Sequence, residues 1–281
     1  MAQAIAKSDI LGVAACVDPI REAAVRVARR AGHNNVYASI DELLRQDDVD
    51  AVVIATPHHV LRETSLAAIR AKKHVLAEKP IATNEREAAE IEQAVMDTGI
   101  RYMAGYSLRF FAAQRHVHDL IAAGAVGEIQ AITAGIGMQP LTGWQATRET
   151  GGGQLLYLGS HLVDAILGIL QDEPREVYAD IRYRADTGTD ETATFQIRFA
   201  GGTVAQCLVT QAVEEWFDYV NIYGRDGRIN LTSSYWLQYT IAVSSRVLEA
   251  YTQPTSICPR LTDDPIMMML VPEVEEFGRA I

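Results

Sequence analysis

The chain has 281 residues, 48% of them hydrophobic and 22% charged, which is the composition of an ordinary folded protein of one or two domains. Its 25 basic and 36 acidic residues give a formal net charge of −11. An acidic surface repels phosphate backbones and anionic headgroups, so we expect neither nucleic acid nor a membrane as the main partner. Since no apolar run approaches the ~18 residues of a membrane span, we expect a cytoplasmic location.

The three cysteines, Cys16, Cys207 and Cys258, are odd in number, far apart and without a C-x-x-C spacing. This pattern favours reduced, buried thiols over disulfides or a zinc site. The two close histidine pairs of the chain do not suit a metal either, because residues one or two apart on a helix point in different directions. We therefore expect no bound metal.

Residues 1–108 have the pattern of alternating strands and helices. Short apolar or β-branched runs alternate with segments in which apolar residues recur every three or four positions. Asn84 with Glu87 three residues on resembles a capping box at the start of one helix. This alternation predicts an α/β domain with a parallel, doubly wound sheet. We expect strands at residues 11–17, 51–55, 74–77 and 101–104, an edge strand near 36–37, and helices at 21–31, 41–45, 62–71 and 85–97.

A dinucleotide-binding unit of this type begins with a strand and a glycine-rich turn, G-x-G-x-x-G, whose amides hold the pyrophosphate. No such turn precedes residue 11, and residues 1–8 are typical of the end of the helix that would follow it. We therefore expect a Rossmann-type sheet without its first strand and glycine-rich loop, in a chain shortened at its amino end. Asp18 either bonds the adenosine ribose and favours NAD over NADP, or starts a turn before Pro19.

A short buried strand at residues 75–77 ends in Glu78, Lys79 and Pro80. Pro80 stops the strand and has no N–H to leave unpaired. The strand thereby fixes Lys79 at its carboxyl end, which is where ligands bind in open α/β sheets. Taken alone, a solvated loop lysine is the commoner case.

Residues 109–281 change to successive strands joined by short turns. At residues 192–199 apolar and polar positions alternate, as in a sheet with one face on a core. The other face is polar with few charges, which suits either solvent or a subunit interface. A last helix at 273–281 is cut off before its cap, so the carboxyl end also looks incomplete. The other expected elements are a helix at 111–123 and strands at 128–137, 176–183, 203–210, 219–223 and 228–232.

One helix interrupts these strands and follows three glycines at residues 151–153. Glycines let a backbone come close to a flat ligand before the helix starts. Tyr157, His161 and Asp164 are spaced four and three residues apart, so all three can share a helix face. A lone helical histidine is more often a satisfied structural residue. Here Asp164 could orient the His161 ring, as the second group of a base and orienter pair does.

Three motifs together resemble the glucose–fructose oxidoreductase and inositol dehydrogenase (Gfo/Idh/MocA) family. In chain order they are Ala55-Thr56-Pro57, Glu78-Lys79-Pro80 and the block at residues 151–164. The similarity runs over nearly the whole chain and includes segments 106–110, 124–128 and 223–227. It implies an NAD(P)-binding domain at residues 1–108. It also implies a substrate-binding and oligomerisation α/β domain at 109–281, with an open, mostly antiparallel sheet.

The resemblance also implies roles for single residues. Lys79 and His161 match the catalytic lysine and histidine of the family, and we expect His161 to take the hydroxyl proton while Lys79 holds the alcohol oxygen. Many relatives carry Asp four residues before the histidine, where this chain has Tyr157, which either donates a proton or packs. The expected cofactor-binding residues are Asp18, Ala55, Thr56, Pro57, His58, Glu78 and Lys79. The expected substrate-binding residues are Tyr106, Arg109, Trp144, Arg148 and Asp164. Packing at a domain interface explains the aromatic and arginine residues equally well.

The function implied is that of an oxidoreductase that transfers hydride between a sugar, cyclitol or related polyol hydroxyl and NAD, with NADP less favoured. The partners implied are a small-molecule substrate and further copies of the chain, in a dimer or tetramer formed through the second domain's sheet. Two alternatives stay open. One is an NAD-dependent glycoside hydrolase of the same fold, and the other is a non-catalytic sensor or regulator.

Overall fold

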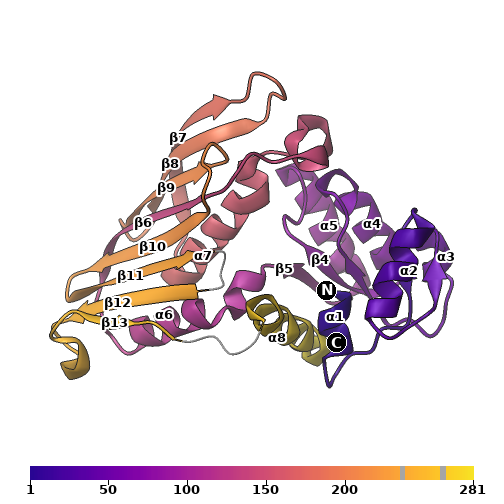
Figure 1. Cartoon of the computed structure of the whole chain (residues 1–281), viewed down its shortest axis with the longest axis horizontal. Helices are drawn as coiled ribbons and strands as arrows, with labels where there is room; N and C mark the ends of the chain where they lie inside the picture. Colours follow the sequence, from indigo (N-terminus) through magenta and orange to yellow (C-terminus); the bar gives the residue numbers. More distant parts are fainter. Residues whose placement is uncertain (235–237, 260–263) are drawn as a thin grey trace. The chain divides into compact units, whose positions relative to one another are not determined.

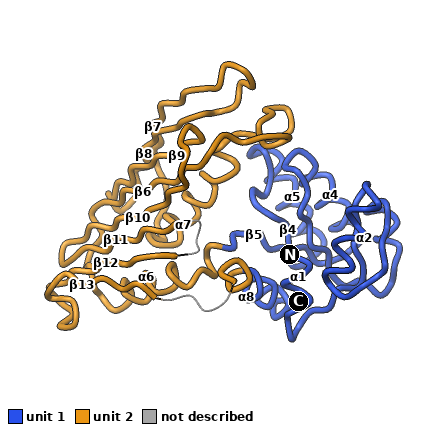
Figure 2. Tube along the Cα trace, in the orientation of Figure 1, with its two compact units in different colours: residues 1–107, 270–281 blue, residues 108–269 orange. Residues whose placement is uncertain are grey.

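The computed structural model describes residues 1–234, 238–259 and 264–281. Two compact units divide the chain, as Figure 2 shows. Unit 1 comprises Met1–Ser107 and Leu270–Ile281, and unit 2 comprises Leu108–Met269. The division after Ser107 lies beside the boundary expected after residue 108. The last residues, expected in the second domain, cluster instead with unit 1.

Unit 1 is built on parallel strands. β3, β4 and β5 form a three-stranded parallel sheet in that order, and β1 pairs in parallel with β2 as a separate sheet. The strand expected at residues 11–17 is therefore much shorter, because β2 offers it only two ladder positions among the described residues. The five strands are β1 (Cys16–Val17), β2 (Val36–Tyr37), β3 (Ala51–Ile54), β4 (His74–Glu78) and β5 (Tyr102–Gly105).

Helices follow the strands of unit 1 in the predicted alternation. The Asn84 side chain accepts a hydrogen bond from the Glu87 N–H at 3.1 Å, so the predicted cap is formed. The Glu87 carboxylate accepts in return from the Thr83 N–H at 3.2 Å, one residue before the N–H that a capping box uses. The helix expected from residue 62 begins four residues earlier, directly after Pro57. The helices are α1 (Ala2–Ala6), α2 (Arg21–Arg30), α3 (Ile40–Leu44), α4 (His58–Arg70) and α5 (Glu85–Thr98).

The last helix, α8 (Pro265–Ala280), carries the end of the chain into unit 1. Val274 and Phe277 are buried on it. Gly278 approaches so closely that an added Cβ would lie 2.8 Å from the Ile10 side chain and 2.9 Å from that of Leu11. Packing of this helix face against the start of the chain explains why residues 270–281 belong to unit 1.

Unit 2 is an eight-stranded sheet with helices on one face (Figure 1). The strand order is β13-β12-β11-β10-β6-β9-β8-β7, and every neighbouring pair is antiparallel except β6 with β9. The predicted fold class, a parallel Rossmann-type unit followed by an open, mostly antiparallel sheet, is thus confirmed. The strands are β6 (Ile129–Gly137), β7 (Pro174–Tyr183), β8 (Asp190–Phe199), β9 (Val204–Thr210), β10 (Phe217–Gly224), β11 (Gly227–Ser234), β12 (Gln238–Ser245) and β13 (Thr255–Ile257).

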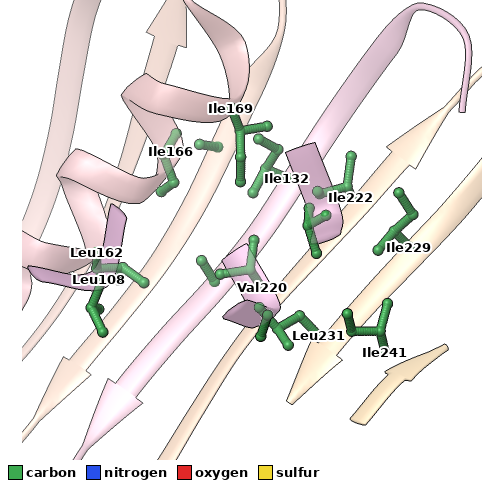
Figure 3. Packing of buried hydrophobic residues seen from close by; sticks show 14 of the residues in the cluster. Leu108, Ile132, Leu162, Ile166, Ile169, Val220, Ile222, Ile229, Leu231 and Ile241 are labelled. Atoms are coloured by element: carbon green, nitrogen blue, oxygen red, sulfur yellow. The ribbon is translucent and has the colours of Figure 1, made fainter. Parts of the chain in front are cut away.

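The core of unit 2 lies between this sheet and the helices α6 (Ala112–Ala122) and α7 (Ser160–Leu170). Ile166 of α7 is fully buried together with Ile132 and Ile222 of the sheet (Figure 3). The segment Arg148–Leu170 is long and apolar enough to cross a membrane, and 56% of its qualifying 18-residue stretch is buried in the protein. Its contacts are those of a core helix in a globular unit. The short helices are η1 (Ser107–Phe110), η2 (Gly143–Ala146), η3 (Arg148–Thr150), η4 (Leu155–Gly159) and η5 (Glu249–Tyr251).

All three cysteines are free, as predicted, and Cys207 is buried in the core of unit 2. Cys16 is half-buried and Cys258 is exposed, so the expectation of buried thiols is met in full only by Cys207. Within the described residues, no cluster of three metal-ligating side chains is found.

Candidate active-site residues

Lys79 lies directly after β4, the middle strand of the three-stranded sheet, and its peptide bond with Pro80 is cis. The residue is only 9% exposed. Burial lowers the pKa of Lys79 from 10.5 to about 8, and the neighbouring Glu78 carboxylate partly opposes this shift. Burial in turn raises the pKa of Glu78. Lys79 is therefore not a solvated loop lysine, and its catalytic role stays a prediction.

The expected nucleotide-binding residues after β3 lie at the same sheet edge as Lys79. Ile54 pairs in register with Ala77, so the chain leaves both parallel strands side by side. Ala55 and Thr56 follow β3, Pro57 is the N-cap of α4, and buried His58 is its first residue. Among the described residues, the Thr56 hydroxyl is buried with no hydrogen-bond partner. A buried hydroxyl in this state fits a ligand group, because buried polar atoms are normally satisfied.

Asp18 follows β1 at the carboxyl end of that strand. Its side chain accepts a hydrogen bond from the Ile20 N–H at 2.8 Å, two residues on. This is the turn-starting role that the sequence left open. The second carboxylate oxygen keeps the capacity to accept a further hydrogen bond, so the turn and a role in ribose binding are compatible.

His161 and Tyr157 lie on one continuous helical segment. It begins with the π-helical turn η4, which contains Tyr157, and continues as α7, whose second residue is the buried His161. The wider π turn was not predicted, because an apolar run with helical spacing does not reveal a local change of pitch. Turns of this type are frequent at functional sites.

The three glycines before this helix accommodate the chain's own backbone and side chains. A Cβ on Gly152 would lie 2.3 Å from the Gln145 carbonyl oxygen, and one on Gly153 would lie 2.2 Å from a carboxylate oxygen of Asp190. Gly151 and Gly153 also have positive φ values of 74° and 119°. These contacts explain the glycines without the flat ligand that the sequence suggested.

Asp164 is engaged by Arg109, also in unit 2. Arg109 Nε donates to Asp164 Oδ2 at 2.9 Å and its Nη2 donates to Oδ1 at 2.6 Å, which is a bidentate pair. The aspartate side chain is 8% exposed, whereas that of the arginine is 61% exposed. The Asp164 carboxylate, which could also orient His161, thus forms an ion pair with Arg109. Arg109 is one of the predicted substrate-binding residues.

The remaining predicted substrate-binding residues lie at three places in the chain. Tyr106 follows β5 in unit 1, Trp144 is half-buried in η2, and Arg148 is exposed at the start of η3. The backbone around η2 and η3 is tied together by Thr150, whose hydroxyl donates to the Trp144 carbonyl at 2.6 Å. The role of these three residues toward a substrate stays a prediction.

Two acids with raised pKa values, the buried Glu273 and the half-buried Asp190, were not identified from the sequence. Glu273 of α8 is 0% exposed and, among the described residues, neither of its carboxylate oxygens has a hydrogen-bond partner. Burial, with a further contribution from Glu78, raises its pKa to about 8. Asp190, at the start of β8, accepts from the Leu155 N–H at 2.8 Å. Glu273 had a sequence signal, because it lies four residues before Phe277 on the buried face of its helix.

Residues 1–106 match the oxidoreductase family with an NAD-binding Rossmann fold, and residues 114–230 match the GFO/IDH/MocA C-terminal domain. This chain belongs to the Gfo/Idh/MocA oxidoreductase family. The family predicted from the motifs is confirmed, and so is the NAD-binding character of unit 1.

Among relatives, the 1,5-anhydro-D-fructose reductase of Ensifer adhaerens is 34% identical over 226 residues, which span 76% of this chain and 67% of that protein. The trans-1,2-dihydrobenzene-1,2-diol dehydrogenase of Danio rerio is 30% identical over 211 residues, which span 74% of this chain and 62% of that protein. The matched residues thus span about two thirds of the length of each of these relatives. A levoglucosan dehydrogenase in complex with NADH shares the fold, with a TM-score of 0.87 at 22% identity, covering 99% of this chain and 86% of the other.

Proposed function

We propose that this Gfo/Idh/MocA protein is a dehydrogenase that transfers hydride between a hydroxyl of a sugar, cyclitol or related polyol and NAD. The observation that carries the proposal is Lys79, a 9% exposed lysine fixed at the carboxyl end of β4 with its pKa lowered to about 8. Perturbed ionisable groups at such a position are typical of functional sites. Two relatives are named for activity on an anhydrosugar and on a cyclic diol, and these names support the same substrate class.

The proposed mechanism divides the proton and the oxygen between two residues. NAD, when bound, supplies the acceptor for the hydride. Lys79 remains mostly an ammonium at pH 7, since its pKa is about 8, and it donates a hydrogen bond to the reacting oxygen. His161 takes the hydroxyl proton, a step that is typically worth about 10²–10⁴ in rate. Tyr157 either donates a proton or packs.

The residues after β3 and β4 would hold the nucleotide. The buried Thr56 hydroxyl has no hydrogen-bond partner among the described residues and would bond the cofactor. Ala55 and Pro57 would pack against it, with His58 and Glu78 at the same edge of the sheet. Asp18 would accept from the ribose hydroxyls, which favours NAD over NADP. Tyr106, Arg109, Trp144 and Arg148 are proposed to contact the substrate, with Asp164 holding the Arg109 guanidinium in place.

Replacing His161 with alanine tests this assignment. Turnover is expected to fall at least a hundredfold, because a positioned base contributes about that much or more. The affinity for NAD, measured by calorimetry, is expected to stay within about threefold of the parent, because His161 acts on the hydroxyl. Unchanged turnover would remove His161 from the mechanism.

A glycoside hydrolase of the same fold is the second candidate. Such an enzyme keeps its NAD bound and hydrolyses the glycoside through a transient oxidation of the substrate. The two activities differ in one measurable product. A dehydrogenase accumulates NADH in proportion to the polyol consumed, whereas the hydrolase releases a free sugar with no net NADH. A non-catalytic regulator would do neither.

The open face of the unit 2 sheet is the proposed contact between copies of the chain, in a cytoplasmic dimer or tetramer. Phe217 and Tyr219 of β10 stack with ring centroids 6.2 Å apart, on the face opposite the core residues Val220 and Ile222. Light scattering is expected to give at least twice the mass of one chain. Leu208→Arg, on the same face in β9, is expected to give the mass of a single chain; a monomeric parent would exclude the proposal.

A further inference from the structure

The helix that carries Tyr157 and His161 begins beside a carboxylate from a distant part of the chain. Asp190, the first residue of β8, accepts a hydrogen bond at Oδ2 from the Leu155 N–H at 2.8 Å. Leu155 is the first residue of the π turn η4, so its N–H is one that a helix start leaves without a partner inside the helix. The carboxylate satisfies this N–H and also places a negative charge at the positive end of the helix.

Asp190 is itself held in place by the sheet. The buried side chain of Gln211, which is 1% exposed, donates from Nε2 to the Asp190 carbonyl at 2.6 Å. The Oε1 atom of Gln211 accepts from the Leu141 N–H at 2.8 Å. These contacts tie the backbone of Asp190 to two segments that are far apart in sequence.

The glycine before the helix makes room for this carboxylate. A Cβ on Gly153 would lie 2.2 Å from Asp190 Oδ1, so only glycine permits this approach. Gly153 also has a φ of 119°, a conformation that other residues rarely adopt. Glycine and aspartate therefore work as a matched pair at the helix start. Gln154, fully buried between them and the sheet, adds a hydrogen bond from Nε2 to the Thr210 carbonyl at 3.2 Å.

We propose that Asp190 is a positioning residue, which fixes the start and the π turn of the helix and thereby sets where Tyr157 and His161 lie. The importance of this position for catalysis rests on the proposed function of His161. The capping itself does not rest on it. An aspartate suits the role because its short side chain spans the gap with few rotamers, and a charged acceptor makes a stronger hydrogen bond than a neutral one.

The test compares Asp190→Ala with Asp190→Asn and with a matched control, Asp218→Ala. Asp218 also lies near the start of a unit 2 strand, and burial raises the pKa of both aspartates. Asp218 accepts hydrogen bonds from Trp216 Nε1 at 2.8 Å and Ser233 Oγ at 2.7 Å, away from η4. Its replacement therefore removes a half-buried, hydrogen-bonded carboxylate of the same kind without touching the helix start.

The readouts are amide hydrogen exchange at Leu155 and the imidazole nitrogen NMR signals of His161, assigned among the seven histidines with a His161→Gln sample. Asp190→Ala is expected to speed exchange at Leu155 at least tenfold and to shift the His161 signals. Asp190→Asn, which keeps an acceptor oxygen, is expected to give smaller changes of both kinds and carries the test if the alanine variant does not fold. Asp218→Ala is expected to leave both readouts unchanged.

Exchange and imidazole signals that stay at parental values in both Asp190 variants would overturn the proposal. Equal effects of Asp218→Ala would also overturn it, since they would reflect general loosening of unit 2. Neither readout depends on turnover. If His161 is not the catalytic base, only the activity of His161→Ala shows it. If Asp190 does not position the helix, only the exchange and NMR signals of the Asp190 variants show it.

Discussion

Replacing Lys79 with methionine is expected to lower turnover at least a hundredfold and, at the same time, to raise the free energy of unfolding at neutral pH. The loss of turnover follows from the proposed role, because the ammonium stabilises charge on the reacting oxygen. The gain in stability follows from burial. A lysine that is 9% exposed holds its charge at a cost, and an apolar side chain of similar length does not.

The pH dependence of this gain has a definite sign. The pKa of Lys79 falls from 10.5 in the unfolded chain to about 8 in the folded chain. Below pH 8 the folded chain carries the full cost of the buried ammonium, which is roughly 3 kcal/mol at about 1.4 kcal/mol per unit. Between pH 8 and 10.5 the unfolded chain binds more protons, so the free energy of unfolding of the parent rises with pH.

Urea titrations at pH 7 and pH 10.5 measure this difference. The methionine variant should exceed the parent in free energy of unfolding by up to about 3 kcal/mol at pH 7 and by little at pH 10.5. A variant that is less stable than the parent at pH 7 would contradict the buried-charge argument. Lys79→Arg is the control for charge. Deprotonation of Lys79 above pH 8 is expected to lower the activity of the parent. Lys79→Arg should move this loss to a higher pH, because an arginine keeps its proton throughout.

Much of the fold follows from local sequence signals. Alternating short strands and helices at residues 51–105 predicted β3, β4 and β5 within a residue or two, because buried parallel strands read as continuous β-branched runs. β12 was not predicted, although Tyr239, Ile241 and Val243 alternate with polar or small residues and are all buried. Its pattern is that of a strand with one face buried.

The residues of the predicted site come from motifs, whereas their contacts depend on long-range packing. Lys79 follows from its place at a strand end, and the structure adds the burial that lowers its pKa. The pairing of Asp164 with Arg109 joins residues 55 positions apart, and the cap from Asp190 to Leu155 joins residues 35 positions apart. The periodic spacing of apolar residues along the sequence does not reveal contacts between residues so far apart. Helix spacing suggested His161 as a partner for Asp164, whereas the contact of Asp164 with Arg109 emerges only from the fold.

Glu273→Gln is expected to raise the free energy of unfolding at alkaline pH by several kcal/mol. Glu273 is 0% exposed, and among the described residues its carboxylate oxygens have no hydrogen-bond partner. Burial in the first place, and the nearby Glu78 carboxylate in the second, raise its pKa from 4.5 to about 8. The ionised form is therefore strongly disfavoured in the folded chain, and glutamine removes that ionisation while keeping the shape of the side chain.

The sign again follows from proton binding. Between pH 4.5 and 8 the folded chain binds more protons than the unfolded chain, so the free energy of unfolding of the parent falls as the pH rises. The full cost, roughly 5 kcal/mol at about 1.4 kcal/mol per unit, is reached above pH 8. Below pH 4.5 the protonated acid and the amide are both neutral, so neither carries the cost of a buried charge. The two proteins should then unfold at nearly the same urea concentration.

Urea titrations of the parent and Glu273→Gln at pH 4.5, 6.5 and 8.5 should therefore show a difference that grows with pH. Glu276→Gln is the matched control, because Glu276 lies on the same helix with a side chain 58% exposed and pairs with Arg279. Its effect should be small at every pH, as for other surface ion pairs. A constant difference between Glu273→Gln and the parent across the three pH values would mean that Glu273 is ionised in the folded protein, and that a partner for it must be sought in unit 1.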